Sequence, residues 1–74
     1  MRLLVVEDEK DVANALHIGL SRDGYAVDVA ENGNKALEAL AVNDYDLLVL
    51  SKIFFNSFAF IFHPFKFFLN IYSV

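Results

Sequence analysis

The stretch Arg2-Leu3-Leu4-Val5-Val6-Glu7-Asp8-Glu9 decides how this chain folds. Its four consecutive apolar residues are typical of a central parallel strand that is covered on both faces, rather than of a strand with one face in water. The apolar run stops at three acids in a row. The sequence therefore predicts a buried strand with carboxylates at its carboxyl end.

Helices and strands alternate after this first strand. Apolar residues recur at helical spacing in two segments, and two further short runs are apolar enough for strands. In chain order we expect a helix over about 10–22 ended by Asp23-Gly24, a strand over 25–30, a helix from the Asn32-Gly33-Asn34 turn to about Asn43, and a strand over 47–50. This alternation predicts an α/β fold with a parallel sheet and right-handed crossovers.

The character of the chain changes after Leu50. All eight phenylalanines lie in residues 51–74, which contain no acid and only two lysines, Lys52 and Lys66. The spacing of the phenylalanines fits a helix, yet 58–62 fits a buried strand equally well. The longest unbroken apolar run in this tail is too short for a membrane-spanning helix of about 20 residues. We expect an irregular or helical tail unrelated to the pattern of residues 1–50.

Composition excludes several functions. Residues 1–50 hold all ten acids and four bases, a net charge of −6, so no basic cluster for nucleic acid is present and no DNA-binding domain is expected. The absence of cysteine removes disulfides and thiolate metal sites. The apolar start is too short and too soon acidic for a signal peptide, which predicts a cytoplasmic protein.

The ordered motifs of residues 1–50 resemble the receiver domain of bacterial two-component response regulators, most closely the subgroup joined to winged-helix DNA-binding domains. The motifs are Arg2–Glu9, Gly24-Tyr25, Ala30-Glu31-Asn32-Gly33 and Tyr45–Leu50. The resemblance implies half of a flavodoxin-like fold, with three parallel strands in the order 2-1-3 and two helices. It divides the chain into a truncated receiver over 1–50 and a separate Phe-rich tail over 51–74.

The resemblance also implies a site and its partners. Glu7 and Asp8 correspond to the acidic pair that holds Mg²⁺ in the family, and position 51 corresponds to the aspartate that accepts a phosphoryl group from a sensor histidine kinase. Position 51 is serine. We therefore expect no phosphoacceptor and no catalytic residue in this chain, and no useful Mg²⁺ binding, because one carboxylate of the three is lost.

Asp46 cannot replace the missing carboxylate. It precedes position 51 by five residues of an extended strand, which at ~3.3 Å per residue puts it ~16 Å away, at the opposite end of the sheet. The family also uses a Ser or Thr after a fourth strand and a Lys after a fifth. No strand pattern in 51–74 places Lys66 or another such residue at the site.

Three functions remain open. The first is a truncated receiver in a phosphorelay system that cannot accept phosphate and is not an enzyme. The second is a phosphate-independent binding module whose tail completes the fold or docks a partner, and the third is a small protein that contacts the membrane through residues 51–74. A third strand left as an apolar sheet edge would favour self-association or aggregation.

Overall fold

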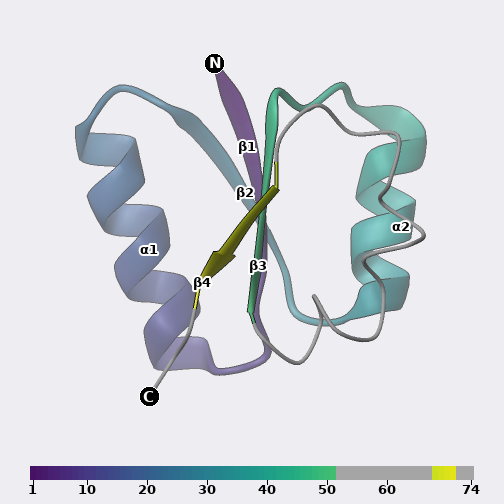
Figure 1. Cartoon of the computed structure of the whole chain (residues 1–74), viewed down its shortest axis with the longest axis horizontal. Coiled ribbons are helices and arrows are strands. Elements are labelled where there is room, and N and C mark those ends of the chain that lie inside the picture. The colour runs from purple at the N-terminus through teal and green to yellow at the C-terminus, as the bar shows by residue number, and fades with distance from the viewer. Residues whose placement is uncertain (52–67, 72–74) are drawn as a thin grey trace.

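The computed structural model describes residues 1–51 and 68–71, which form two helices and four strands (Figure 1). The predicted alternation is confirmed up to residue 51. In chain order the elements are β1 (Arg2–Val6), α1 (Lys10–Arg22), β2 (Ala26–Ala30), α2 (Gly33–Val42), β3 (Leu47–Ser51) and β4 (Phe68–Ile71).

The four strands form one parallel sheet in the order β2-β1-β3-β4. β1 lies in the interior, with Val6 level with Ala30 of β2 on one side and with Leu50 of β3 on the other. The continuous apolar runs fit this position, because Leu4, Val6 and Leu50 are completely buried. The predicted order 2-1-3 of a flavodoxin-like fold is confirmed.

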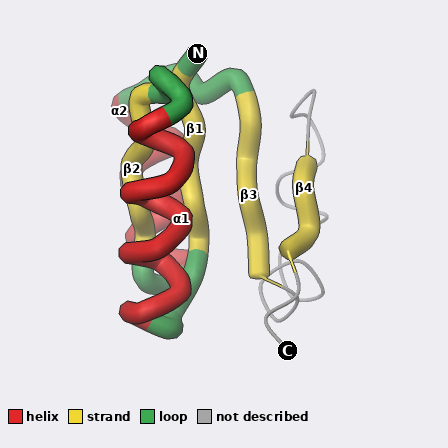
Figure 2. Tube along the Cα trace, turned by 90° about the vertical axis from the view of Figure 1, so that its left-hand side faces the viewer, coloured by secondary structure: helices red, strands yellow, loops and turns green. Residues whose placement is uncertain are grey.

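The two helices cover opposite faces of the sheet at its β1–β2 side (Figures 1 and 2). α1 ends where Gly24 adopts a positive φ of 94°, which an L side chain rarely tolerates. α2 begins after Asn32, whose side-chain oxygen accepts a hydrogen bond of 2.8 Å from the backbone of Lys35. The end of α1 and the start of α2 therefore lie where the Asp23-Gly24 and Asn32-Gly33-Asn34 segments predict them.

The largest core cluster lies between the sheet and α2. It contains Leu4, Val6, Ala30, Ala36, Tyr45, Leu48 and Leu50, with Ala39 and Leu40 packed against it. These residues come from β1, β2, β3, α2 and the segment before β3, so burial of this cluster holds the first three strands against α2. Among residues 1–51 and 68–71, no helix is long and apolar enough to cross a membrane.

The expectation of an irregular or helical tail is wrong for residues 68–71. They form β4, which runs parallel to β3 with Leu48 level with Phe68 and Ser51 level with Ile71. β3 is therefore an interior strand rather than the exposed edge that we expected. Local sequence was ambiguous between helix and strand, and the open backbone groups of β3 favour the strand because they can pair only with an extended segment.

Other expectations about the tail fall outside the described residues. These concern the helix-or-strand ambiguity of residues 58–62, the placement of Lys52 and Lys66, and contact of 51–74 with a membrane.

Candidate functional site

The carboxyl ends of β1 and β3 lie side by side, as the sequence predicts. Val6 is level with Leu50 in parallel pairing, so the next residue on each strand, Glu7 and Ser51, reaches the same end of the sheet. Asp8 follows directly. An acidic pair and the residue at position 51 are thus brought together by two strands that are far apart in the sequence.

Among residues 1–50, Glu7 is the only buried residue with a polar or charged side chain, with 4% of its surface exposed. Its backbone N–H donates to Ala30 O at 3.0 Å, and its Oε2 accepts a hydrogen bond of 3.0 Å from the backbone N–H of Glu9. Burial raises the pKa of Glu7, and the neighbouring Asp8 raises it further, while the hydrogen bond from Glu9 opposes the shift. A cation at this end of the sheet would offset the free-energy cost of keeping the buried Glu7 carboxylate charged.

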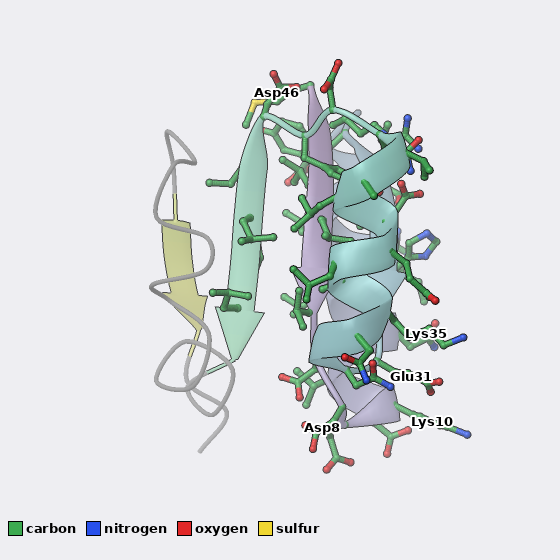
Figure 3. The ribbon with its side chains drawn as sticks, turned by 90° about the vertical axis from the view of Figure 1, so that its right-hand side faces the viewer. Asp8, Lys10, Glu31, Lys35 and Asp46 are labelled. Atoms are coloured by element: carbon green, nitrogen blue, oxygen red, sulfur yellow. The ribbon has the colours of Figure 1, made fainter. Side chains whose placement is uncertain are left out.

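Asp8 is exposed and extends beyond the end of the sheet, below the start of α1 (Figure 3). Carboxylate oxygens are ligands that Mg²⁺ accepts while it keeps several waters, so the donor chemistry of Glu7 and Asp8 fits this ion. No group of three His, Asp or Glu residues gathers anywhere in 1–51 or 68–71. The site therefore offers two carboxylates, one buried and one in water.

Asp46 lies at the opposite end of the sheet from Asp8, as expected (Figure 3). Its Oδ2 accepts a hydrogen bond of 2.8 Å from the backbone N–H of Arg2, and its own N–H donates to Arg2 O at 2.8 Å. These bonds join the amino ends of β1 and β3. Asp46 thus has a structural role and does not contribute to the acidic pair.

A groove of about 630 Å³ extends from the acidic pair along β2, between this strand and α1. Lys10 of α1 and Lys35 of α2 line its acidic end, together with Asp8 and Glu31 (Figure 3). His17 lines it further along and is exposed. The sequence alone did not indicate this groove.

A second polar cluster, around Asp28, was also missed from the sequence. Asp28 Oδ2 accepts hydrogen bonds from the Tyr45 hydroxyl at 2.6 Å and from Arg2 Nη2 at 2.8 Å, and the Arg2 guanidinium carbon lies 5.3 Å from the centre of the Tyr45 ring. The only signal was an acid within an otherwise apolar strand. Its partners could not be identified without the pairing of β1 with β2.

These contacts predict a pH-dependent contribution to stability. The hydrogen bonds from Tyr45 and then from Arg2 lower the pKa of Asp28 below its ordinary value of 3.8. The stabilisation is therefore fully present at pH values above the pKa that Asp28 has in the unfolded chain. It is lost as the pH falls through the lower pKa that Asp28 has in the folded chain. Because the Asp28 side chain is 41% exposed, we expect Asp28→Asn to cost only about 1 kcal/mol at pH 7.

Urea unfolding of the wild type and of Asp28→Asn at pH 7 and pH 3 tests this prediction. The difference in free energy of unfolding should shrink at pH 3. An equal difference at both pH values would show that the charge of Asp28 does not contribute.

Comparisons with known proteins agree with this geometry. The chain is 54% identical over 52 residues to the transcriptional regulatory protein CutR of Streptomyces coelicolor, covering 70% of this chain and 24% of CutR. It is 50% identical over 50 residues to the transcriptional regulatory protein DltR of Streptococcus agalactiae, covering 68% of this chain and 22% of DltR. The chain thus spans about a quarter of the length of these curated relatives. No protein-family model matches it.

Solved structures extend the comparison. The receiver domain of Francisella response regulator 1452 matches with a TM-score of 0.65 and 30% identity, over 68% of this chain and 41% of that chain. The response regulator TrrA of Thermotoga maritima, solved in complex with Mg(2+)-BeF, matches with a TM-score of 0.75 and 31% identity, over 97% of this chain and 70% of TrrA. With this coverage and with two carboxylates at the carboxyl end of β1, the chain belongs to the receiver domains of the two-component response regulators.

Proposed function

We propose that residues 1–50 are the first half of a receiver whose sequence pattern is interrupted at Ser51, and that this chain accepts no phosphoryl group and has no turnover of its own. The pairing of Val6 with Leu50 supports this proposal most directly. This pairing brings position 51 to the same end of the sheet as the acidic pair. The family resemblance requires an aspartate at that position, and this chain has a serine there.

The chemistry of serine supports the proposal. Phosphoryl transfer in this family needs an anionic oxygen that attacks phosphorus while positive charge stabilises the transferring group. A serine hydroxyl is protonated at neutral pH and attacks only if a general base removes its proton. Glu7 and Asp8 are carboxylates, which are far weaker bases than a serine alkoxide, and Glu7 Oε2 already accepts a hydrogen bond from the backbone N–H of Glu9. Neither residue is a suitable base for Ser51.

Magnesium binding is a separate part of the proposal. TrrA was solved with Mg(2+)-BeF, and the resemblance to the family assigns the Mg²⁺-binding acids to Glu7 and Asp8 in this chain. We propose that these two residues would hold Mg²⁺ weakly, with water in the remaining positions. The ion would supply positive charge to neutralise a phosphoryl group. Without a third carboxylate, the ion is poorly held and this charge is not used.

A second candidate function is a phosphate-independent binding module. The pairing of β4 with β3 favours it, because four residues of the Phe-rich tail continue the parallel sheet on the side where receiver strands normally follow. In this case the chain would contact the partner of its family, a sensor histidine kinase, without receiving phosphate. A cooperative thermal transition in the full chain would support this function over that of a non-functional fragment.

Phosphoryl labelling tests the first function. We expect no covalent phosphate on the full chain after incubation with Mg²⁺ and acetyl phosphate or a phosphorylated histidine kinase, under conditions where an intact receiver is labelled. Mass spectrometry and loss of label in hydroxylamine would detect an acyl phosphate. Stoichiometric labelling at any residue of this chain would contradict the proposal.

A further inference from the structure

The outer edge of β2 carries backbone groups without a strand partner in the described sheet, where β2 is the last strand. Ala26 N donates to Met1 O at 3.1 Å, and Ala30 O accepts from Glu7 N at 3.0 Å, so these two residues face β1. Alternation along a parallel strand then turns the N–H and C=O groups of Val27 and Val29 away from β1. These groups form a short template for another strand.

The β2 edge lacks the usual protection against strand pairing. Edge strands are commonly protected by Pro, by Lys, or by a bulge, and the segment from Tyr25 to Ala30 contains none of the three. Its one charge, on Asp28, is bound to Arg2 and Tyr45. Two apolar side chains are exposed instead: Tyr25 at 37% and Val29 at 42%.

The approach to this edge is open on the α1 side. The groove of about 630 Å³ is lined by Val27 and Val29 of the strand and by Asn14 and His17 of the helix. Val29 remains 42% exposed beside this groove, so α1 leaves the outer strand partly uncovered on this side.

We propose that β2 pairs antiparallel with β2 of a second copy of this chain, about a two-fold axis at Val27. The hydrogen-bonded pairs must join residues with outward-facing backbone groups, and registers centred on Val27, Asp28 or Val29 meet this condition at the middle of the strand. An Asp28 centre places two carboxylates opposite each other, and a Val29 centre places Val27 opposite Glu31 of the partner subunit. A Val27 centre avoids both arrangements.

The Val27 register also covers the exposed apolar side chains. It places Tyr25 opposite Val29 of the partner subunit, twice by symmetry, and aromatic with β-branched pairs are favourable across antiparallel strands. Asp28 then faces the small Ala26 of the partner subunit. Because the two-fold contact uses the same surface on both copies, it closes at a dimer. The inference does not depend on whether the chain accepts phosphate.

Single cysteines provide a sharp test, because the chain has no cysteine of its own. In the full chain under mild oxidation, Val27→Cys should form a disulfide-linked dimer, since the two Val27 positions meet at the axis. Val29→Cys is the matched control, because the two Val29 positions lie about 13 Å apart in this register. Equal cross-linking of both variants, or of Val29→Cys alone, would overturn the proposal.

A charge on the edge gives a second test that needs no cross-link. Val29→Lys should raise the dimer dissociation constant at least about tenfold in sedimentation velocity, because an edge lysine opposes strand pairing. Leu37→Lys places the same charge on α2, at a residue of similar exposure, 40%. This control should leave the dimer dissociation constant unchanged. A wild-type chain that is monomeric at high concentration, or association that Val29→Lys does not weaken, would overturn the proposal.

Discussion

Replacement of Leu48 with alanine is expected to unfold the chain. Leu48 is completely buried in the core cluster, on a strand that lies between β1 and β4. A Leu→Ala change in such a position costs about 2–5 kcal/mol, because burial energy is lost and a cavity remains. Chains of this size rarely have more than about 3–5 kcal/mol of stability. In thermal unfolding followed by circular dichroism, Leu48→Ala should therefore show no folded baseline, or melt tens of degrees below the wild type.

Leu37→Ala is the matched control for this experiment. Leu37 is 40% exposed on α2, so the same substitution removes little buried surface, and alanine is an excellent helix former. We expect its free energy of unfolding to remain within about 0.5 kcal/mol of the wild type. If the two variants melted at the same temperature, Leu48 would not be buried in solution and the sheet described above would be wrong.

Replacement of Ser51 with aspartate should strengthen Mg²⁺ binding without creating a phosphoacceptor. It adds an anionic oxygen donor beside Glu7 and Asp8, the two acids already at this end of the sheet. An additional carboxylate ligand should lower the dissociation constant for Mg²⁺ by at least about tenfold, or ~1.4 kcal/mol. Labelling with acetyl phosphate should still fail, because the described sheet lacks the fifth strand that presents a lysine in the family.

Ser51→Asn separates charge from shape in this test. Asparagine has almost the same shape as aspartate but no negative charge, so it should bind Mg²⁺ about as weakly as the wild type. Isothermal titration with MgCl₂ measures all three proteins. Equal affinity of Ser51→Asp and Ser51→Asn would show that position 51 does not contribute to the ion site, and a labelled Ser51→Asp would show that four strands suffice for transfer.

The course of residues 1–50 could be predicted from the sequence because its signals are local and agree with one another. Four apolar residues before Glu7 indicate a buried parallel strand, and Asn32 and Gly24 mark helix boundaries with side-chain or backbone chemistry of their own. The alternation of helix and strand then restricts the topology, since crossovers between parallel strands are right-handed. The end of the sheet that carries the acids follows from this topology.

The partners of Asp28 and the strand at residues 68–71 could not be predicted in this way. Asp28, Arg2 and Tyr45 are distant in the sequence, and their contact depends on the register of β1 against β2. The four residues of β4 have no local preference strong enough to exclude a helix. Their extended conformation depends on pairing with β3. The sequence of residues 68–71 alone carries no information about that partner strand.

The sequence by itself determined the order of the elements, the position of the acidic pair and the serine at position 51, because each depends on residue type and on short-range periodicity. Only the tertiary structure decided that Glu7 is buried, that β4 pairs with the edge of β3, and that β2 is the last strand of the described sheet. These properties depend on which segments meet in space, and that is set by the packing of the whole sheet rather than by any one segment.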